Sequence, residues 1–155
     1  MNREEFQRDF YGDSWIYSVN RDNQYNFDTA KFLIEVMSSS KKKGICCDVG
    51  IGDGYPIAKM LLESKAEVHG VDMSVKLIKK CKNNFPEIFC KIGSAEDLPF
   101  ENDLFDLTYC INTLWYVKNP MKAISELLRF TRPGGIVCFD KLNHNNKEII
   151  NCTNV

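Results

Sequence analysis

Short apolar segments alternate with amphipathic ones along most of this chain of 155 residues. Apolar runs of strand length lie at residues 44–49, 67–71, 88–92, 105–111 and 136–139. Between them, apolar residues recur at helical spacing over residues 27–37, 56–61, 74–81 and 120–128. Asp28 and Ser74 are placed to cap two of these helices, Pro56 suits a first helical turn, and Asn119-Pro120 opens the last helix.

Strands that alternate with short helices indicate βαβ units and a mostly parallel sheet covered on both faces. We therefore expect an α/β fold of the doubly wound, Rossmann-like class with about five strands. Ligands of such folds bind beyond the carboxyl ends of the strands, where the strand order reverses. We expect one domain, with an N-terminal cap of helices over 1–43, a core over 44–140 and a polar tail over 141–155.

Composition and charge narrow the classes of partner. The chain is 44% hydrophobic and 26% charged, with a net charge of −1, as in ordinary soluble domains. No apolar run approaches the ~20 residues that cross a bilayer, and the polar start does not resemble a secretory signal. Because there is no basic excess for nucleic acid, we expect a cytoplasmic protein that binds a small molecule and neither nucleic acid nor membrane.

The cysteines and histidines predict neither disulfides nor metal. Of the seven cysteines, four lie inside apolar runs, where Cys behaves as a small hydrophobe: Cys46, Cys90, Cys110 and Cys138. An odd number without a secretory signal argues against a disulfide framework. The two histidines, His69 and His144, have no metal-ligand spacing, so we expect no metal site.

The most informative segment is the glycine-rich turn DVGIGDG, residues 48–54, between the first strand and the next helix. Glycines there allow a tight turn and close approach of a ligand. Asp72 ends the second strand, where a carboxylate accepts hydrogen bonds from both hydroxyls of a ribose. The alternatives are that Asp48 caps the loop and that Asp72 caps the following helix.

The spacing of the glycines disfavours a dinucleotide. The third glycine comes one residue early at Gly54, and Tyr55 occupies the dinucleotide position. Pro56 lacks an N–H for pyrophosphate, and Asp48 and Asp53 place negative charge where phosphate would lie. A zwitterionic ligand without phosphate fits better, so a nicotinamide-dependent oxidoreductase is the less favoured alternative.

Four motifs in order make the chain resemble the class I S-adenosylmethionine-dependent methyltransferases, of the small-molecule type. They are DVGIGDG, GVDMS at 70–74, SAEDLPFENDLFDL at 94–107 and LLRFTRPGGIVCF at 127–139, and the match covers almost two thirds of the chain. The resemblance implies S-adenosylmethionine as cofactor and methyl transfer as the reaction. It also implies that the cofactor contacts come from Asp48, Gly50, Ile51, Gly52, Gly54, Asp72, Met73, Ser94, Ala95, Glu96, Cys110 and Asn112.

Within this resemblance Asp72 is the ribose ligand and Met73 an adenine neighbour, whereas residues 110–112 at the end of the fourth strand lie beside the methionine part. Asn112 equally suits a cap of the following loop. Ser94 departs from the family pattern, which has an acidic residue there to accept from the adenine amino group. A neutral acceptor is about half as strong, so a modest cofactor affinity is expected. No general base is identified. Candidates for an aromatic lid or for core are Trp15, Tyr17, Tyr25, Trp115 and Tyr116, and Arg129 matches a basic family position or pairs with Glu126.

The C-terminus is short for this family, which continues with another helix and two more strands. Only 16 residues follow Phe139, and many of them are Asn. We therefore expect a sheet that lacks those last two strands and leaves the strand at 136–139 with an open edge. Such an edge invites pairing with a second copy or a partner. The alternative function is accordingly a non-catalytic or truncated cofactor-binding fragment that acts as an interaction module.

Overall fold

The computed structural model describes residues 22–39, 44–142 and 148–155. Its helices are α3 (Gln24–Ser39), α4 (Ile57–Glu63), α5 (Val75–Asn84), α6 (Pro120–Phe130) and the short 3-10 helix η1 (Leu114–Tyr116). Its strands are β1 (Ile45–Val49), β2 (Glu67–Asp72), β3 (Phe89–Ile92), β4 (Phe105–Cys110), β5 (Thr131–Leu142) and β6 (Glu148–Asn154). All five predicted strands and all four predicted helices are present. Trp15, Tyr17 and His144 lie outside the described residues.

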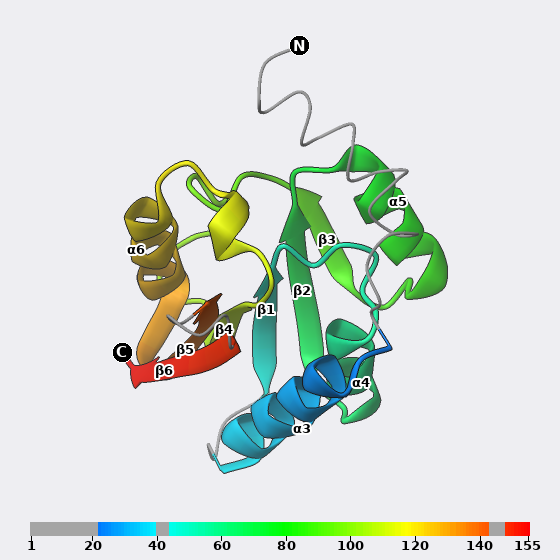
Figure 1. Ribbon diagram of the computed structural model, residues 1–155, viewed down its shortest axis with the longest axis horizontal. Helices are drawn as coiled ribbons and strands as arrows, with labels where there is room; N and C mark the ends of the chain where they lie inside the picture. The colour runs from blue at the N-terminus through cyan, green and yellow to red at the C-terminus, as the bar shows by residue number, and fades with distance from the viewer. Residues whose placement is uncertain (1–21, 40–43, 143–147) are drawn as a thin grey trace.

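The strands form one sheet in the order β3-β2-β1-β4-β5-β6 (Figure 1). The pairs from β3 to β5 are parallel, and β6 is antiparallel to β5. The chain therefore runs outward from β1 to β3 and then crosses back to β4, which places the reversal of strand order between β1 and β4. The predicted Rossmann-like α/β class is confirmed.

Two hydrophobic clusters cover the two faces of the sheet. On one face α3, α4 and α5 bury Leu33, Leu61 and Ile78 against β1 and β2. On the other face α6 buries Leu127 and Phe130 together with the segment that precedes β4. Figure 1 shows α6 on the opposite side of the molecule from α5. Because both faces are covered, the open end of the sheet at the carboxyl ends of the strands remains for a ligand.

The starts of three helices depend on short polar side chains. Ser74 accepts from the amide of Leu77, and Asn119 accepts from that of Lys122, so the predicted starts of α5 and α6 are confirmed. The predicted cap at Asp28 is wrong, because α3 begins earlier, at Gln24. There the side-chain oxygen of Asn23 accepts from the amide of Asn26 at 2.8 Å. Hydrophobic periodicity located the helix but not its first turn, where Gln24 and Asn26 alternate with aromatic residues.

The C-terminal residues correct two expectations. Residues 148–154 form β6, which pairs with β5 from Ile136↔Asn154 to Leu142↔Glu148. The predicted open edge at 136–139 is therefore wrong, since β6 occupies it, and the sheet has one strand more than expected. β6 contains Ile149, Ile150 and Thr153, which favour strands, but its two Asn residues interrupt them, so the sequence pattern alone did not indicate a strand there.

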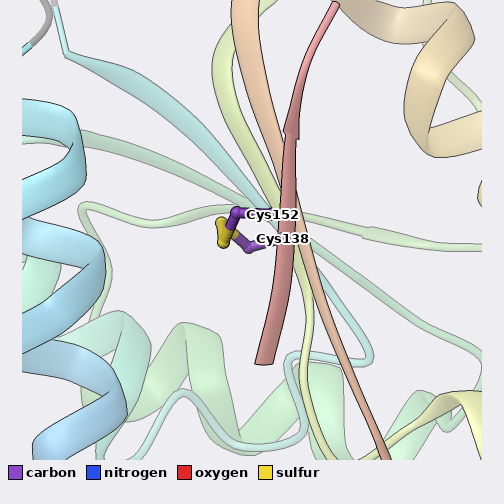
Figure 2. Close-up of a disulfide and its surroundings, with 2 residues drawn as sticks. All are labelled: Cys138 and Cys152. Carbon is purple, nitrogen blue, oxygen red and sulfur yellow. A yellow bond between two sulfur atoms is a disulfide. The ribbon is translucent and has the colours of Figure 1, made fainter. Parts of the chain in front are cut away.

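A disulfide between Cys138 of β5 and Cys152 of β6 joins the same two strands (Figure 2). The two residues are direct partners in the antiparallel register. The expectation of no disulfide is therefore wrong, because it rested on counting cysteines and not on which of them face each other. The other five cysteines are free and buried. No helix in the described ranges is long and apolar enough to span a bilayer.

Arg129 of α6 fastens the segment before β4. Its guanidinium donates to both carboxylate oxygens of Glu126 at 2.8 Å and to the backbone oxygens of Leu98 and Phe100. Glu126 also accepts from the amide of Leu98 at 2.9 Å. The pairing of Arg129 with Glu126 is confirmed, and its structural effect is to hold residues 98–100 against α6.

We expect Glu126→Gln to lower the free energy of unfolding by about 1 kcal/mol near pH 7, because charge-assisted hydrogen bonds to Arg129 are lost. The hydrogen bond from Arg129 lowers the pKa of Glu126 in the folded protein. The stabilisation is therefore complete above the unfolded pKa of about 4.3 and is lost as pH falls through the folded pKa. Urea unfolding of wild type and variant across this range measures it.

A matched control is Glu63→Gln, which removes the partner of Lys59 in an exposed pair. Its effect should stay below about 0.5 kcal/mol at every pH. The prediction for Glu126 fails if the difference between wild type and Glu126→Gln does not shrink in acid.

Candidate functional site

A cavity of about 810 Å³ opens at the carboxyl ends of β1, β2 and β4, where the strand order reverses. Of the predicted site residues, its wall includes Asp48, Gly50, Ile51, Gly52, Gly54, Asp72, Met73, Ser94, Ala95, Glu96 and Asn112. Cys110 is not brought to this wall; it is fully buried in the cluster under α6. The volume is in the range of pockets that hold small ligands and cofactors.

The glycine-rich turn is held by backbone hydrogen bonds to the end of β2. The amides of Gly50 and Ile51 both donate to the oxygen of Val71, at 2.7 and 3.1 Å. Gly50, Gly52 and Gly54 all have positive φ, between 60° and 87°. Non-glycine residues rarely adopt this conformation, so the turn needs glycine at these positions.

Gly50 meets a second constraint from the loop that follows β4. A Cβ atom at this position would overlap the side chain of Thr113. The hydroxyl of Thr113 in turn donates to the oxygen of Ile111 at 3.1 Å, which fixes the side chain in place. The turn after β1 and the loop after β4 therefore approach each other as closely as a missing Cβ allows.

Asp72 connects β2 to the glycine-rich turn. Its carboxylate accepts from the amide of Gly52 at 3.0 Å and from that of Ser74 at 2.8 Å. Burial raises the pKa of Asp72, although these two hydrogen bonds oppose the rise. Each carboxylate oxygen has two lone pairs, so both still have capacity to accept from a ligand in the cavity. The N-cap of α5 is Ser74, and Asp72 supports it from outside the helix.

Asp48 lies deeper, with only 6% of its surface exposed. Burial raises its pKa well above the usual range, and the nearby Asp72 raises it further, although the Tyr109 hydroxyl has the opposite effect. A buried carboxyl of this kind is stabilised in its charged form by a cationic group. The part of the cavity beside Asp48 therefore favours an ammonium group over a phosphate.

Glu96 joins two segments of the cavity wall. One oxygen of its carboxylate accepts from the amides of Lys118 and Asn119, at 2.8 and 3.0 Å. The Ser94 hydroxyl accepts from the amide of Glu96 at 3.2 Å, so this segment forms a tight turn. Ser94 and Ala95 thus line the cavity while the Glu96 side chain joins them to the start of α6.

Asn112 follows β4 and is held by groups that sequence reasoning missed. Its amide donates to both oxygens of Asp140, and its side-chain nitrogen donates to Asn26 at 3.0 Å. Asp140 is fully buried and also accepts from the hydroxyl of Tyr25 at 3.1 Å. Asn26 also lines the cavity. A signal for Asp140 was present, since it follows the apolar run at 136–139 at the carboxyl end of a strand.

Aromatic side chains lie at the cavity rim. Trp115 and Tyr116 of η1 line the cavity, whereas Tyr25 is not among the lining residues and contacts Asp140. Tyr55 lines it too, and its hydroxyl donates to Asp22 at 2.6 Å. Two of the predicted lid residues are therefore at the rim. Within the described ranges, no three His, Cys, Asp or Glu side chains gather in a way that would hold a metal.

Residues 47–139, which run from within β1 to within β5, match the family described as methyltransferase domain. The chain belongs to this family. The predicted resemblance to class I methyltransferases is thereby confirmed, and S-adenosylmethionine is the cofactor that the family and its structural neighbours support.

Relatives differ in what their names say they act on. A tRNA U34 carboxymethyltransferase of Cellvibrio japonicus is 28% identical over 144 residues, covering 88% of this chain and 44% of the relative. A demethylmenaquinone methyltransferase of Renibacterium salmoninarum is 32% identical over 97 residues, covering 63% of this chain and 40% of the relative. The chain thus spans less than half of either protein. Because one of these relatives is named for tRNA, the comparison does not support the expected exclusion of nucleic acid.

The fold is shared with solved methyltransferases. A structure of geranyl diphosphate methyltransferase with geranyl diphosphate and sinefungin has a TM-score of 0.65 at 20% identity. That alignment covers 74% of this chain and 45% of the solved one. At this identity the likeness concerns the arrangement of helices and strands.

Proposed function

We propose that this chain binds S-adenosylmethionine in the cavity at the ends of β1, β2 and β4 and transfers its methyl group to a small-molecule acceptor. The observation that carries the proposal is the joint placement of Asp72 and the turn at Gly50–Gly54 on one cavity wall. Asp72 is hydrogen-bonded to that turn through Gly52. A carboxylate that accepts from ribose hydroxyls and a glycine turn that does not suit a phosphate thus form one unit.

The wall residues divide the cavity by chemistry. Asp72 accepts from ribose hydroxyls, and Met73 with the Ser94–Ala95 turn lies on the adenine side. Asp48 and the glycine turn receive the amino-acid part, where a buried carboxyl favours an ammonium group. When bound, the cofactor supplies an activated methyl group on a sulfonium. The chain's own residues orient the two reactants and exclude water.

Charge supports a small acceptor. The net charge of the full chain is −1, and among the described residues the cavity wall carries Asp48, Asp72 and Glu96 against one cation, Lys118. Recognition of tRNA needs phosphate contacts from several Lys and Arg side chains, whereas the described part of this wall supplies Lys118 alone. Trp115 and Tyr116 at the rim offer flat apolar surfaces to an acceptor.

Calorimetry with S-adenosylhomocysteine tests the cofactor assignment, with NADH as the comparison ligand. We expect saturable binding of the first and none of the second. A cofactor-release assay against small molecules and a bulk tRNA preparation then tests the acceptor. Turnover with tRNA alone would overturn the small-molecule assignment, and absence of S-adenosylhomocysteine binding would overturn the function as a whole.

A further inference from the structure

Two cysteine side chains lie against each other next to the glycine-rich turn, outside the cavity wall. Cys81 belongs to α5 and Cys90 to β3, and their sulfur atoms are 3.3 Å apart and share a hydrogen bond. Both residues are buried. Since bonded sulfur atoms are about 2.05 Å apart, a movement of roughly 1.3 Å would join them.

Cys81 is also in contact with the turn. A Cβ at Gly54 would lie 3.0 Å from the sulfur of Cys81 and 2.8 Å from the ring of Phe85. Gly54 itself lines the cavity, and its amide donates to the oxygen of Ile51 at 3.1 Å. Because interiors are close-packed, displacing this sulfur changes the support of the turn.

Cys90 is among the residues that line a second pocket. This pocket, of about 470 Å³, is also lined by His69 and Lys82. The hydrogen bond with Cys81 lowers the pKa of Cys90, and the Lys82 ammonium also lowers it, while burial opposes both. The thiolate is the form of cysteine that reacts with oxidants. Cys90 is therefore the attacking thiol and Cys81 the resolving one.

We propose that Cys81 and Cys90 form an oxidation site, at which a peroxide converts the two thiols to a disulfide that weakens ligand binding in the neighbouring cavity. The first half, the site of modification, stands on the sulfur geometry and the pocket. The second half rests on the proposed cofactor function of that cavity.

The chemistry balances with hydrogen peroxide as the oxidant. The Cys90 thiolate attacks one peroxide oxygen, the O–O bond breaks, and the leaving hydroxide takes a proton to become water. The resulting sulfenic acid is attacked by the Cys81 sulfur, which loses its proton as the S–S bond forms and a second water leaves. The two thiols are oxidised to one disulfide, and one peroxide is reduced to two waters.

Peptide mapping with trypsin tests the site directly. Cleavage after Lys80, Lys82 and Lys91 separates the dipeptide 81–82 from the peptide 83–91. A disulfide holds these two peptides together, at a mass lower by two hydrogen atoms than their sum. We expect the linked species after peroxide treatment of the full chain and its loss after dithiothreitol.

The effect on the cavity is measured by calorimetry with S-adenosylhomocysteine on reduced and oxidised protein. We expect oxidation to weaken binding roughly tenfold, because the turn at Gly54 loses its packed support. Cys90→Ser taken through the same cycle should show no change, which separates this pair from the Cys138–Cys152 bond. Cys46→Ala, which removes another buried free thiol, should respond to oxidation like the wild type.

Each outcome tests one of the two parts of the proposal, the oxidation site or its effect on the cavity. Absence of the linked peptide in folded, peroxide-treated protein overturns the oxidation site. A linked peptide with unchanged affinity overturns its effect on the cavity. If reduced protein does not bind S-adenosylhomocysteine at all, the proposed function fails and the effect on the cavity falls with it, whereas the linked peptide still decides the oxidation site.

Discussion

Gly50→Ala is expected to lower the free energy of unfolding by about 3 kcal/mol, which combines left-handed backbone strain with overpacking. Gly50 has a φ of 87°, and a Cβ there would overlap the side chain of Thr113. The turn after β1 or the loop after β4 must then move, and both line the cavity. Urea unfolding measures the stability, and calorimetry with S-adenosylhomocysteine measures the accompanying loss of binding.

Gly44→Ala is the matched control for this substitution. Gly44 also has a positive φ, of 73°, but the nearest atom to a Cβ there is the Met37 sulfur at 4.0 Å. The control should therefore cost only the backbone strain, about 1–2 kcal/mol, and leave ligand binding intact. Equal destabilisation by the two substitutions would show that the approach of Thr113 does not constrain the turn.

Asp72→Asn is expected to weaken S-adenosylhomocysteine binding roughly 100-fold, because a charged acceptor for ribose hydroxyls is lost together with one backbone hydrogen bond. The amides of Gly52 and Ser74 both donate to this carboxylate. An Asn side chain offers one oxygen where Asp offers two, so the turn and the ligand compete for it. Calorimetry gives the affinity, and thermal unfolding shows how much of the loss is structural.

The control is Asp103→Asn, an exposed position whose φ of 57° suits Asn. It removes the same charge from the chain at a site that is not on the cavity wall. Binding within a factor of two of the wild type is expected there. If Asp72→Asn and Asp103→Asn bind equally well, Asp72 is not a ligand of the cofactor.

Much of the architecture was predictable because its signals are local. The apolar runs at 44–49 and 105–111 correspond to the buried central strands β1 and β4, and Ser74 and Asn119 cap the expected helices. The glycine turn was recognised because its three positive φ angles require a residue type that is visible in the sequence. Asp72 was found for a related reason, since a carboxylate directly after an apolar strand stands at the ligand-binding edge.

The parts that escaped prediction depend on partners distant in sequence. β6 owes its conformation to β5, and the Cys138–Cys152 bond exists because the antiparallel register places these residues opposite each other. Asn26 lines the cavity and accepts a hydrogen bond from Asn112, which is 86 positions away in the sequence. Cys110 was expected beside the ligand because the resemblance places the end of the fourth strand there, but its side chain belongs to the cluster under α6. Alternation along a strand decides the face only once the register is known.

Asp140 gives the cavity one rigid side. Its buried carboxylate holds the first turn of α3 through Tyr25 and the end of β4 through Asn112, so separating these segments would leave a desolvated acceptor without its donors. The hydrogen bonds that the Glu96 carboxylate accepts from the amides of Lys118 and Asn119, in contrast, are exposed, and water replaces them at little cost. We therefore expect ligand exchange to be asymmetric, with the Glu96 side opening more readily than the side that α3 and Asp140 form.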